Sequence, residues 1–169
     1  MKKRLFDIIC ALIGLFLTGW FLVLCWILSS IDCRSNGIFI QKRIGRYGIP
    51  FHIFKLKTMK LQLNQRGETV HEVTPLGAFF RRYKIDEFPQ FLNVLFGQMS
   101  MVGPRPDVPG YYDKLEGENR NVLKLRPGLT SEASIKYAHE EALLKTVSDP
   151  LKYNDEVLFP DKVSMNLNY

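Results

Sequence analysis

Two clusters of charged residues carry the residue types that phosphate chemistry requires. The first is residues 81–89 (RRYKIDEFP), in which the adjacent carboxylates Asp86 and Glu87 stand among three cations. The second is residues 104–106 (PRP), about twenty residues further along the chain. Arginine binds phosphate oxygens through two parallel hydrogen bonds, and a carboxylate can attack phosphorus or hold Mg²⁺ beside substrate phosphates. These residues are therefore the first candidates for a catalytic site.

Two interpretations of the Asp86-Glu87 pair stay open from the residues alone. If a helix begins near Asp86, both carboxylates would cap its first turn and complement the positive end of the helix dipole. If the same helix start binds an anion, its free N–H groups and the flanking arginines would together hold phosphate. In that second case an ionised carboxylate is available as a nucleophile or as a ligand of Mg²⁺.

Other catalytic patterns are absent from the sequence. The histidines His52, His71 and His139 have no metal-ligand spacing, and none of the three cysteines forms a Cys-x-x-Cys pair. The chain also lacks a Gly-x-Ser-x-Gly motif, a Walker loop and a dinucleotide-binding fingerprint. We therefore expect the histidines to be ordinary surface or core residues and the cysteines to be reduced, as in a cytosol.

The net charge of +6 is unevenly distributed along the chain. Residues 1–67 contain eleven Lys and Arg against two acidic residues, whereas residues 68–169 contain twelve against fifteen. A nucleic-acid-binding domain would interleave basic and aromatic residues over its surface, so nucleic acid is not an expected partner. The basic excess instead accompanies an N-terminal apolar segment, where each cation contributes about 1 kcal/mol of attraction to anionic lipid headgroups.

Residues 5–31 form this apolar segment, 27 residues with a single charge at Asp7. The length exceeds the roughly 18 residues that a membrane helix needs. The segment is also longer than the apolar core of a secretory signal, and no Ala-x-Ala-like site follows it, so we expect it to be retained. The remaining chain, about 135 residues, is enough for one domain.

Basic residues flank both ends of the apolar segment. Residues 2–4 (KKR) precede it, and eight further Lys and Arg follow between positions 33 and 67 with no acidic residue among them. Basic flanks stay on the cytoplasmic side, so both ends favour the same side, as in a helix that enters and leaves the bilayer there. Thr18-Gly19, near the middle, could permit the bend. A straight span stays open, because glycine is also common in ordinary membrane helices.

The rest of the chain predicts an α/β (α+β), mostly helical domain. Alternating apolar residues over 38–57, interrupted by a Gly-x-x-Gly turn, indicate a β-hairpin. The polar stretch 61–73 indicates a loop, and Thr74 and Pro75 then supply the N-cap and first position of a helix. The other expected elements are helices at 86–97, 108–125 and 132–144, a strand at 99–102, and irregular breaks at 103–106 and 126–128.

The order of these motifs resembles the bacterial sugar transferase family, the monotopic polyprenyl-phosphate glycosyl-1-phosphate transferases. The matching motifs run from residue 3 to about residue 137 and are KRxFD, QKRxGxxGxPF, FKxKTM, DEFPQ, NV, MSxVGPRP and RPGLT. The resemblance implies a re-entrant membrane helix over residues 1–33 and a cytoplasmic catalytic domain over 34–169, with several helices lying on the membrane. It also implies the bacterial inner (cytoplasmic) membrane as the location.

The resemblance also implies an activity. Such enzymes move a sugar-1-phosphate from a UDP-sugar to undecaprenyl phosphate and release UMP, through a phospho-aspartate intermediate and with Mg²⁺. This step initiates capsule, exopolysaccharide, lipopolysaccharide or glycoprotein-glycan synthesis. Asp86 would be the catalytic nucleophile and Glu87 its partner, and both would bind the metal. The implied substrate-binding residues are Lys55, Lys57, Arg81, Pro104, Arg105, Pro106 and Arg126.

The chain departs from the family pattern at several places. The family breaks its re-entrant helix with Ser-Pro, whereas this chain has Gly19-Trp20. Lys57 replaces a usual arginine, and Ala138 stands near the place of a further phosphate-binding arginine. The chain ends at Tyr169, near where related sequences add another apolar or amphipathic segment, as a truncated chain would.

An alternative function is a non-catalytic, membrane-anchored adaptor or an inactive relative. The changes at Lys57 and Ala138 favour it, whereas the intact Asp86-Glu87 pair and Arg105 oppose it. No motif identifies the sugar or the pathway. The oligomeric state is equally open, with a homodimer among the alternatives.

Overall fold

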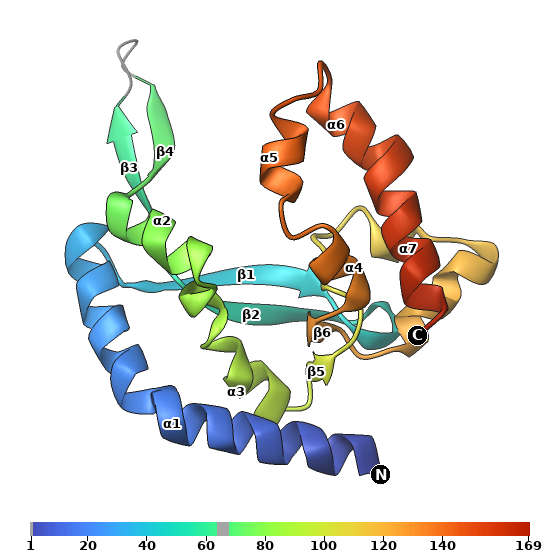
Figure 1. Cartoon of the computed structure of the whole chain (residues 1–169), viewed down its shortest axis with the longest axis horizontal. Coiled ribbons are helices and arrows are strands. Elements are labelled where there is room, and N and C mark those ends of the chain that lie inside the picture. Colours follow the sequence, from blue (N-terminus) through green and yellow to red (C-terminus); the bar gives the residue numbers. More distant parts are fainter. Residues whose placement is uncertain (1, 64–67) are drawn as a thin grey trace. The chain divides into compact units, whose positions relative to one another are not determined.

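The computed structural model describes residues 2–63 and 68–169 (Figure 1). The chain divides into two compact units. Unit 1 comprises residues 1–42 and 52–97, and unit 2 comprises residues 43–51 and 98–169. These units are defined by contacts within the protein. The expected division at residue 33 instead separates a membrane-inserted part from a cytoplasmic part, and it stays a prediction.

Unit 1 begins with the long helix α1 (Lys2–Asp32). Many of its apolar side chains are exposed, among them Phe16 (85%) and Trp20 (72%). In the part of the chain that the structure describes, α1 is the one helix long and apolar enough to cross a membrane. This confirms the predicted apolar helix, whose bare surface suits lipid better than water.

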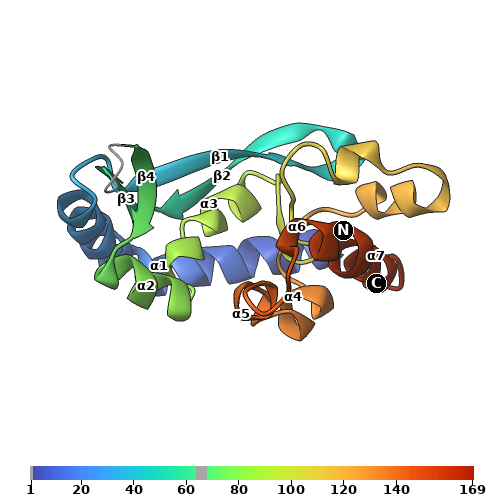
Figure 2. The same cartoon turned by 90° about the horizontal axis from the view of Figure 1, so that it is seen from above.

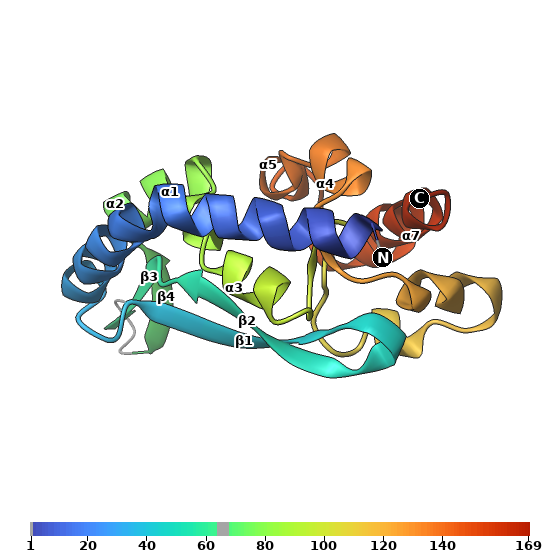
Figure 3. The ribbon, with the colours of Figure 1, turned by 90° about the horizontal axis from the view of Figure 1, so that it is seen from below.

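Helix α1 changes direction part-way along its length (Figures 1 and 3). Near its middle, Thr18 Oγ1 donates a hydrogen bond to the Gly14 carbonyl at 2.7 Å. Such a bond to the carbonyl four residues back often bends a helix. Gly19 follows, and a Cβ there would meet nothing within 4 Å. A threonine and a glycine therefore accompany a bend that has no proline.

The predicted β-hairpin is confirmed. Strands β1 (Ile38–Ile44) and β2 (Pro50–Leu56) pair in a two-stranded sheet and run side by side in Figure 2. Gly45 N donates to the Ile49 carbonyl across the turn at 2.9 Å. Tyr47 and Gly48 have positive φ angles of 60° and 77°, a left-handed conformation that glycine adopts readily.

The core of unit 1 joins α1, the hairpin and helix α2 (Pro75–Arg82). Thr74 caps α2 by accepting a hydrogen bond from Gly77 N at 2.9 Å, as its place before Pro75 predicts. One buried cluster contains Cys25, Leu56, Phe80 and Ile85. This cluster ties the apolar helix to the polar part of the unit.

The helix expected at residues 86–97 is shorter than predicted. Asp86 and Glu87 lie in a 3-10 turn, η2 (Ile85–Glu87), and the α-helix α3 (Gln90–Leu95) begins only after Pro89. Phe88 and Pro89 both have helical backbone angles, but Pro89 lacks the N–H that would continue the backbone hydrogen bonds from the 3-10 turn into α3, which explains the late start. No α-helix begins at Asp86, so both interpretations that place the carboxylates at a helix N-terminus, capping and anion binding, are wrong. Gly97, with φ of 77°, ends the segment as predicted.

A second hairpin occupies much of the loop predicted at residues 61–73. Strand β3 (Met59–Leu63) pairs antiparallel with β4 (Thr69–Val73). The loop prediction is wrong for these strands. Of its remaining part, residue 68 is irregular as predicted, and residues 64–67 lie outside the described residues. The two strands, MKLQL and TVHEV, contain as many polar as apolar residues, and β4 is almost entirely exposed. The pairing satisfies their backbone groups, so a mixed and exposed pattern can still form strands.

Unit 2 contains a small parallel sheet of β5 (Ser100–Val102) and β6 (Gly128–Thr130). Strand β5 confirms the expected strand, and residues 103–106 after it are irregular, as predicted. Strand β6 is unexpected. The stretch predicted as helix at 108–125 contains two 3-10 helices, η3 (Tyr112–Lys114) and η4 (Gly117–Lys124), and no α-helix.

Short helices complete unit 2. The expected helix at 132–144 is split into α4 (Glu132–Lys136) and α5 (Glu140–Leu144). A continuous helical run follows, made of α6 (Pro150–Tyr153), the π turn η5 (Asn154–Leu158) and α7 (Phe159–Leu167) (Figure 1). The core of the unit contains Ile44, Tyr112, Val122, Leu123 and Val163. The mostly helical α+β fold with small sheets is thus confirmed.

Candidate active site

Asp86 and Glu87 occupy a buried turn of unit 1, each with 7% of its surface exposed. Lys84, with φ of 57°, turns the chain in the left-handed conformation just before them. Ile85 then enters the core beside Phe80. Because a turn residue and a core residue come immediately before the carboxylates, packing of the whole unit holds them in place.

Lys55 of β2 forms an ion pair with Glu87. The Lys55 Nζ lies 3.0 Å from Glu87 Oε1, and both side chains are largely buried. Their mutual attraction offsets part of the cost of taking two charges out of water, and loss of one partner would remove this compensation from the other charge. Lys57, two residues on, points elsewhere, because its Nζ donates to Ser35 Oγ at 2.8 Å.

Asp86 carries an oxygen that the described residues leave without a hydrogen bond, the buried Oδ1. Burial raises the pKa of Asp86, and the positive charge of Lys55 opposes this effect. Glu87 raises the pKa further, whereas Lys84 and Arg81 lower it. An ionisable oxygen with an unused lone pair in a buried site has the properties of a nucleophile or a metal ligand.

The donor set fits Mg²⁺. Among the described residues there is no group of three His, Cys, Asp or Glu side chains that could hold a metal by themselves. Mg²⁺, however, commonly uses one or two protein carboxylates and completes its shell with water and substrate phosphates. The unpartnered Oδ1 of Asp86 and the adjacent Glu87 carboxylate match this pattern.

The predicted arginine-bearing loops belong to unit 2. The parallel pairing of β5 with β6 brings residues 103–106 beside residues 126–128. Gly103 N donates to the Thr130 carbonyl at 2.9 Å. One small sheet therefore holds together two segments that are distant in the sequence, and these segments carry Arg105 and Arg126.

Glycine is required where these two loops meet. Gly128 N donates to the Pro104 carbonyl at 2.8 Å. A Cβ on Gly103 would lie 2.2 Å from the carbonyl oxygen of Arg126, and a Cβ on Gly128 would lie 2.1 Å from Gly103 N. Neither gap admits a side chain, so backbone contacts and proline rings fix the shape of both loops.

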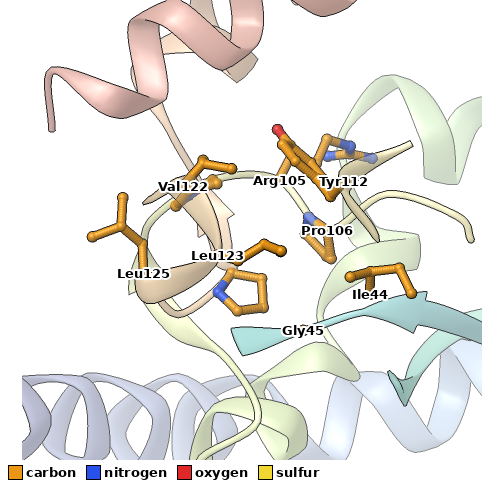
Figure 4. A pocket seen from close by; sticks show the side chains of 10 residues that line it. Ile44, Gly45, Arg105, Pro106, Tyr112, Val122, Leu123 and Leu125 are labelled. Atoms are coloured by element: carbon orange, nitrogen blue, oxygen red, sulfur yellow. The ribbon is translucent and has the colours of Figure 1, made fainter. Parts of the chain in front are cut away.

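The Pro-Arg-Pro loop lines a small pocket within unit 2 (Figure 4). Arg105 is exposed, whereas Pro104 and Pro106 are buried. Tyr112 is buried in the same lining, and burial raises its pKa to about 12. The remaining walls come from Ile44, Gly45, Val122, Leu123, Leu125 and Pro127. The pocket therefore combines mostly apolar walls with one guanidinium.

The predicted site residues thus fall into two groups, one in each unit. The structure brings Asp86, Glu87 and Lys55 together in unit 1, with Arg81 close enough to lower the pKa of Asp86. In unit 2 it brings together the segments that carry Pro104, Arg105, Pro106 and Arg126. Their roles in binding and catalysis stay predictions.

Two residues that hold the unit 1 site in place had no predicted role. Arg4 donates from Nη1 to the Val94 carbonyl (2.6 Å) and from Nη2 to the Leu95 carbonyl (2.9 Å), which caps the C-terminus of α3. Asn93 of α3 is fully buried, and its amide bonds to β2. The sequence holds a detectable signal for Asn93, because it is a polar residue at a helix position where the pattern predicts an apolar one. No local signal exists for Arg4, whose partners are 90 and 91 residues away.

Several characterised or named proteins are similar to this chain. A Bacillus subtilis (strain 168) protein, provisionally named an undecaprenyl-phosphate N-acetylgalactosaminyl 1-phosphate transferase, is 40% identical over 121 residues, covering 69% of this chain and 68% of the relative. The UDP-glucose:undecaprenyl-phosphate glucose-1-phosphate transferase of Caulobacter vibrioides (strain ATCC 19089 / CIP 103742 / CB 15) is 36% identical over 146 residues, covering 80% and 54%. The protein of the same name from Escherichia coli (strain K12) is 37% identical over 145 residues, covering 80% and 31%.

The chain therefore spans from about a third to about two thirds of the length of these relatives. A family model described as bacterial sugar transferase matches residues 1–169. The match covers every motif on which the resemblance rests, from the N-terminal basic residues to RPGLT. The chain belongs to the bacterial sugar transferase family.

Proposed function

We propose that this chain is a membrane-bound phosphoglycosyl transferase, which moves a sugar-1-phosphate from a UDP-sugar to undecaprenyl phosphate and releases UMP. The observation that carries the proposal is the unpartnered, buried oxygen of Asp86 beside the Lys55–Glu87 ion pair. The names of the relatives support the substrate classes, since they give undecaprenyl phosphate as the acceptor of a sugar 1-phosphate. The product would initiate the synthesis of a surface polysaccharide or glycan.

In this proposal Asp86 is the nucleophile. Its Oδ1 attacks the phosphorus that bears the sugar, the bond from that phosphorus to the bridging diphosphate oxygen breaks, and UMP leaves with the electron pair. An oxygen of undecaprenyl phosphate then attacks the same phosphorus, and the Asp86 carboxylate leaves. The covalent step means that the two anionic substrates need not react with each other directly.

Positive charge from the chain would balance the charge of the substrates. Lys55 favours the ionised form of Asp86 that the attack requires and holds the Glu87 carboxylate. Arg81 and Arg105 carry planar guanidinium groups suited to phosphate oxygens. The family resemblance adds Lys57, Arg126, Pro104 and Pro106 to the proposed substrate-binding residues. Asp86 and Glu87 would hold Mg²⁺, which supplies additional positive charge at the diphosphate.

We also propose that α1 enters the bilayer and returns to the same side. Near its start, Arg4 is bonded to the carbonyls at the end of α3. Near its end, the hydroxyl of Ser29 donates to the Lys57 carbonyl after β2. Both partners belong to unit 1. A straight helix of 31 residues would be about 46 Å long, longer than the roughly 30 Å hydrocarbon core, and would carry its ends to opposite sides.

The bend of α1 and the basic residues at both of its ends support the same arrangement (Figure 3). Basic flanks stay in the cytoplasm, so the catalytic residues would face the cytoplasm at the inner membrane. There the phosphate of a lipid acceptor lies at headgroup level. Such an arrangement would place Asp86 within reach of the lipid phosphate.

The test of the activity is UMP release from a panel of UDP-sugars, with the membrane-bound protein, undecaprenyl phosphate and Mg²⁺. We expect at least one donor to give UMP and a lipid-linked sugar diphosphate, and none to do so with Asp86→Asn. Asp161→Asn, which changes a half-buried aspartate of unit 2, is the matched control and should leave the rate unchanged. No release by the wild type from any donor, or full activity of Asp86→Asn, would refute the proposal.

The test of the membrane arrangement is the side on which the N-terminus lies. A tag placed at Met1 should be accessible only after the inner membrane is permeabilised, as should a tag at Tyr169. A Met1 tag accessible from outside in intact spheroplasts would leave a straight span as the correct arrangement.

A further inference from the structure

Asn93 is the buried polar side chain that links α3 to β2. It has 0% of its surface exposed. Its Oδ1 accepts a hydrogen bond from Phe54 N at 3.1 Å, and its Nδ2 donates to the His52 carbonyl at 2.7 Å. Both ends of the amide are therefore used, and these two partners are main-chain groups of one strand.

The two partners lie on one edge of β2 (Pro50–Leu56). A strand edge presents alternating N–H and carbonyl groups that a neighbouring strand would normally bind. The Asn93 amide carries one donor and one acceptor side by side, as a peptide group does. It thus takes the place of a third strand at this point and fixes the position of α3 along β2.

This link adjoins the proposed catalytic residues. Lys55 follows Phe54 directly on β2, and Glu87 precedes Asn93 by six residues in the segment that continues into α3. The ion pair between Lys55 and Glu87, at 3.0 Å, is a second connection between the same two segments. A shift of α3 along β2 would therefore change the ion pair and, with it, the charge around Asp86.

We propose that Asn93 is a positioning residue, which sets the register between α3 and β2 and thereby the geometry of the Lys55–Glu87 pair next to Asp86. The inference rests on the proposed function for its kinetic readout. In the proposed reaction Asn93 touches no reacting atom, and it acts only through the ion pair. Other side chains of similar size do not replace it, because Asp lacks the donor for the His52 carbonyl and Leu lacks both groups.

The test compares wild type with Asn93→Asp and Asn93→Ser for turnover at saturating UDP-sugar and for KM. We expect kcat per folded enzyme to fall roughly 10- to 100-fold, because a misplacement of about 1 Å in a catalytic group has effects of this size. The KM for the UDP-sugar should change by less than about threefold, since the substrate-binding arginines are untouched. Thr74→Ala is the matched control, because it removes a buried cap of α2 in the same unit. It should lower the melting temperature without lowering kcat.

A double-mutant cycle separates positioning from general stability. In a Lys55→Met background, Asn93→Asp should lower kcat by less than about threefold, because the contact through which it acts is already gone. An equal loss in both backgrounds, or a kcat for Asn93→Asp as high as that of Thr74→Ala, would overturn the inference. If the wild type itself releases no UMP, the proposed function fails first. If Asn93→Asp does not fold, Asn93→Ser decides by the same comparison.

Discussion

The carboxylate turn of unit 1 and the arginine loops of unit 2 are held in place by different means. Asp86 and Glu87 are buried, and side chains constrain them: the Lys55 ion pair and the core residue Ile85. The loop around Arg105 is fixed by main-chain hydrogen bonds and by glycines that admit no Cβ, while its arginine is exposed. Burial adjusts the reactivity of a carboxylate, whereas a rigid backbone with an exposed arginine suits the capture of a large anion. The two regions should therefore respond differently to substitution.

The largest effect is expected at the buried nucleophile. Asp86→Asn should lower UMP release roughly 1,000-fold or more, because an amide cannot form the phosphoryl bond. Its melting temperature should equal or exceed that of the wild type. Burial raises the pKa of Asp86, so the neutral amide avoids the cost of a buried charge. A parallel loss of activity and of stability would contradict this comparison.

The next effect is on the backbone that holds Arg105. Gly103→Ala should destabilise unit 2 by about 3 kcal/mol or more, because its Cβ would lie 2.2 Å from the Arg126 carbonyl oxygen. Urea unfolding measures the loss. Gly117→Ala is the control: Gly117 has a positive φ of 55° but no neighbour within 4 Å of the added Cβ, so the backbone strain alone should cost only about 1 kcal/mol. Equal losses would show that the close approach does not matter.

In unit 1 the corresponding effect comes from a side chain. Lys55→Met should destabilise the protein by about 3 kcal/mol, because it removes the Lys55 cation from the buried Glu87 carboxylate. The double variant Lys55→Met/Glu87→Gln should recover much of this loss in urea unfolding, since the Glu87 charge that Lys55 compensated is removed as well. A double variant less stable than Lys55→Met alone would argue that packing of the side chains, and not their charge, holds the turn.

Arg105→Ala should change binding without changing stability. The side chain is exposed, whereas hydrogen bonds to a charged group contribute about 1.5–3 kcal/mol. We expect KM for the UDP-sugar to rise roughly tenfold or more and the melting temperature to stay constant. Arg120→Ala removes another exposed arginine of unit 2, which bonds the Leu115 carbonyl, and should leave KM unchanged.

The smallest effect is the pH dependence of the C-terminal helices. Hydrogen bonds from Lys136 and Tyr137 lower the pKa of Asp161 below its usual 3.8. A lowered folded-state pKa gives stability that is present above the unfolded-state pKa and is lost as the pH falls through the folded-state pKa. Asp161→Asn should therefore lower the melting temperature slightly at pH 7. The difference in melting temperature from the wild type should vanish well below pH 3.8. A constant difference down to pH 2 would show that the Asp161 charge is not its cause.

Local signals predict much of the fold. The alternation over residues 38–57 and the Thr74 cap each depend on neighbours in sequence, and the structure confirms both. The carboxylate turn is different. Whether a continuous helix begins at Asp86 depends on the left-handed Lys84, on Ile85 reaching the core and on Pro89, and only the packed unit decides among them.

The same distinction applies to the candidate site. The residue types at 55, 81, 86, 87 and 105 are visible in the sequence, because charged residues and prolines at fixed spacings have few structural explanations. The contacts that place them are not visible. Lys55 meets Glu87 across 32 residues, and Arg4 meets the end of α3 across 90. Arg4 therefore looks like a headgroup-binding residue in the sequence, while in the fold it is a helix cap.

The bend in α1 has a consequence for the mechanics of the helix. A proline kink is covalent, because the ring removes an N–H for the lifetime of the protein. Here the deviation accompanies a hydroxyl bond from Thr18 to Gly14, which one side-chain rotation breaks and restores. The helix therefore keeps all of its backbone N–H donors, and the hydrogen bond that accompanies its bend can form or break without any change in the covalent chain.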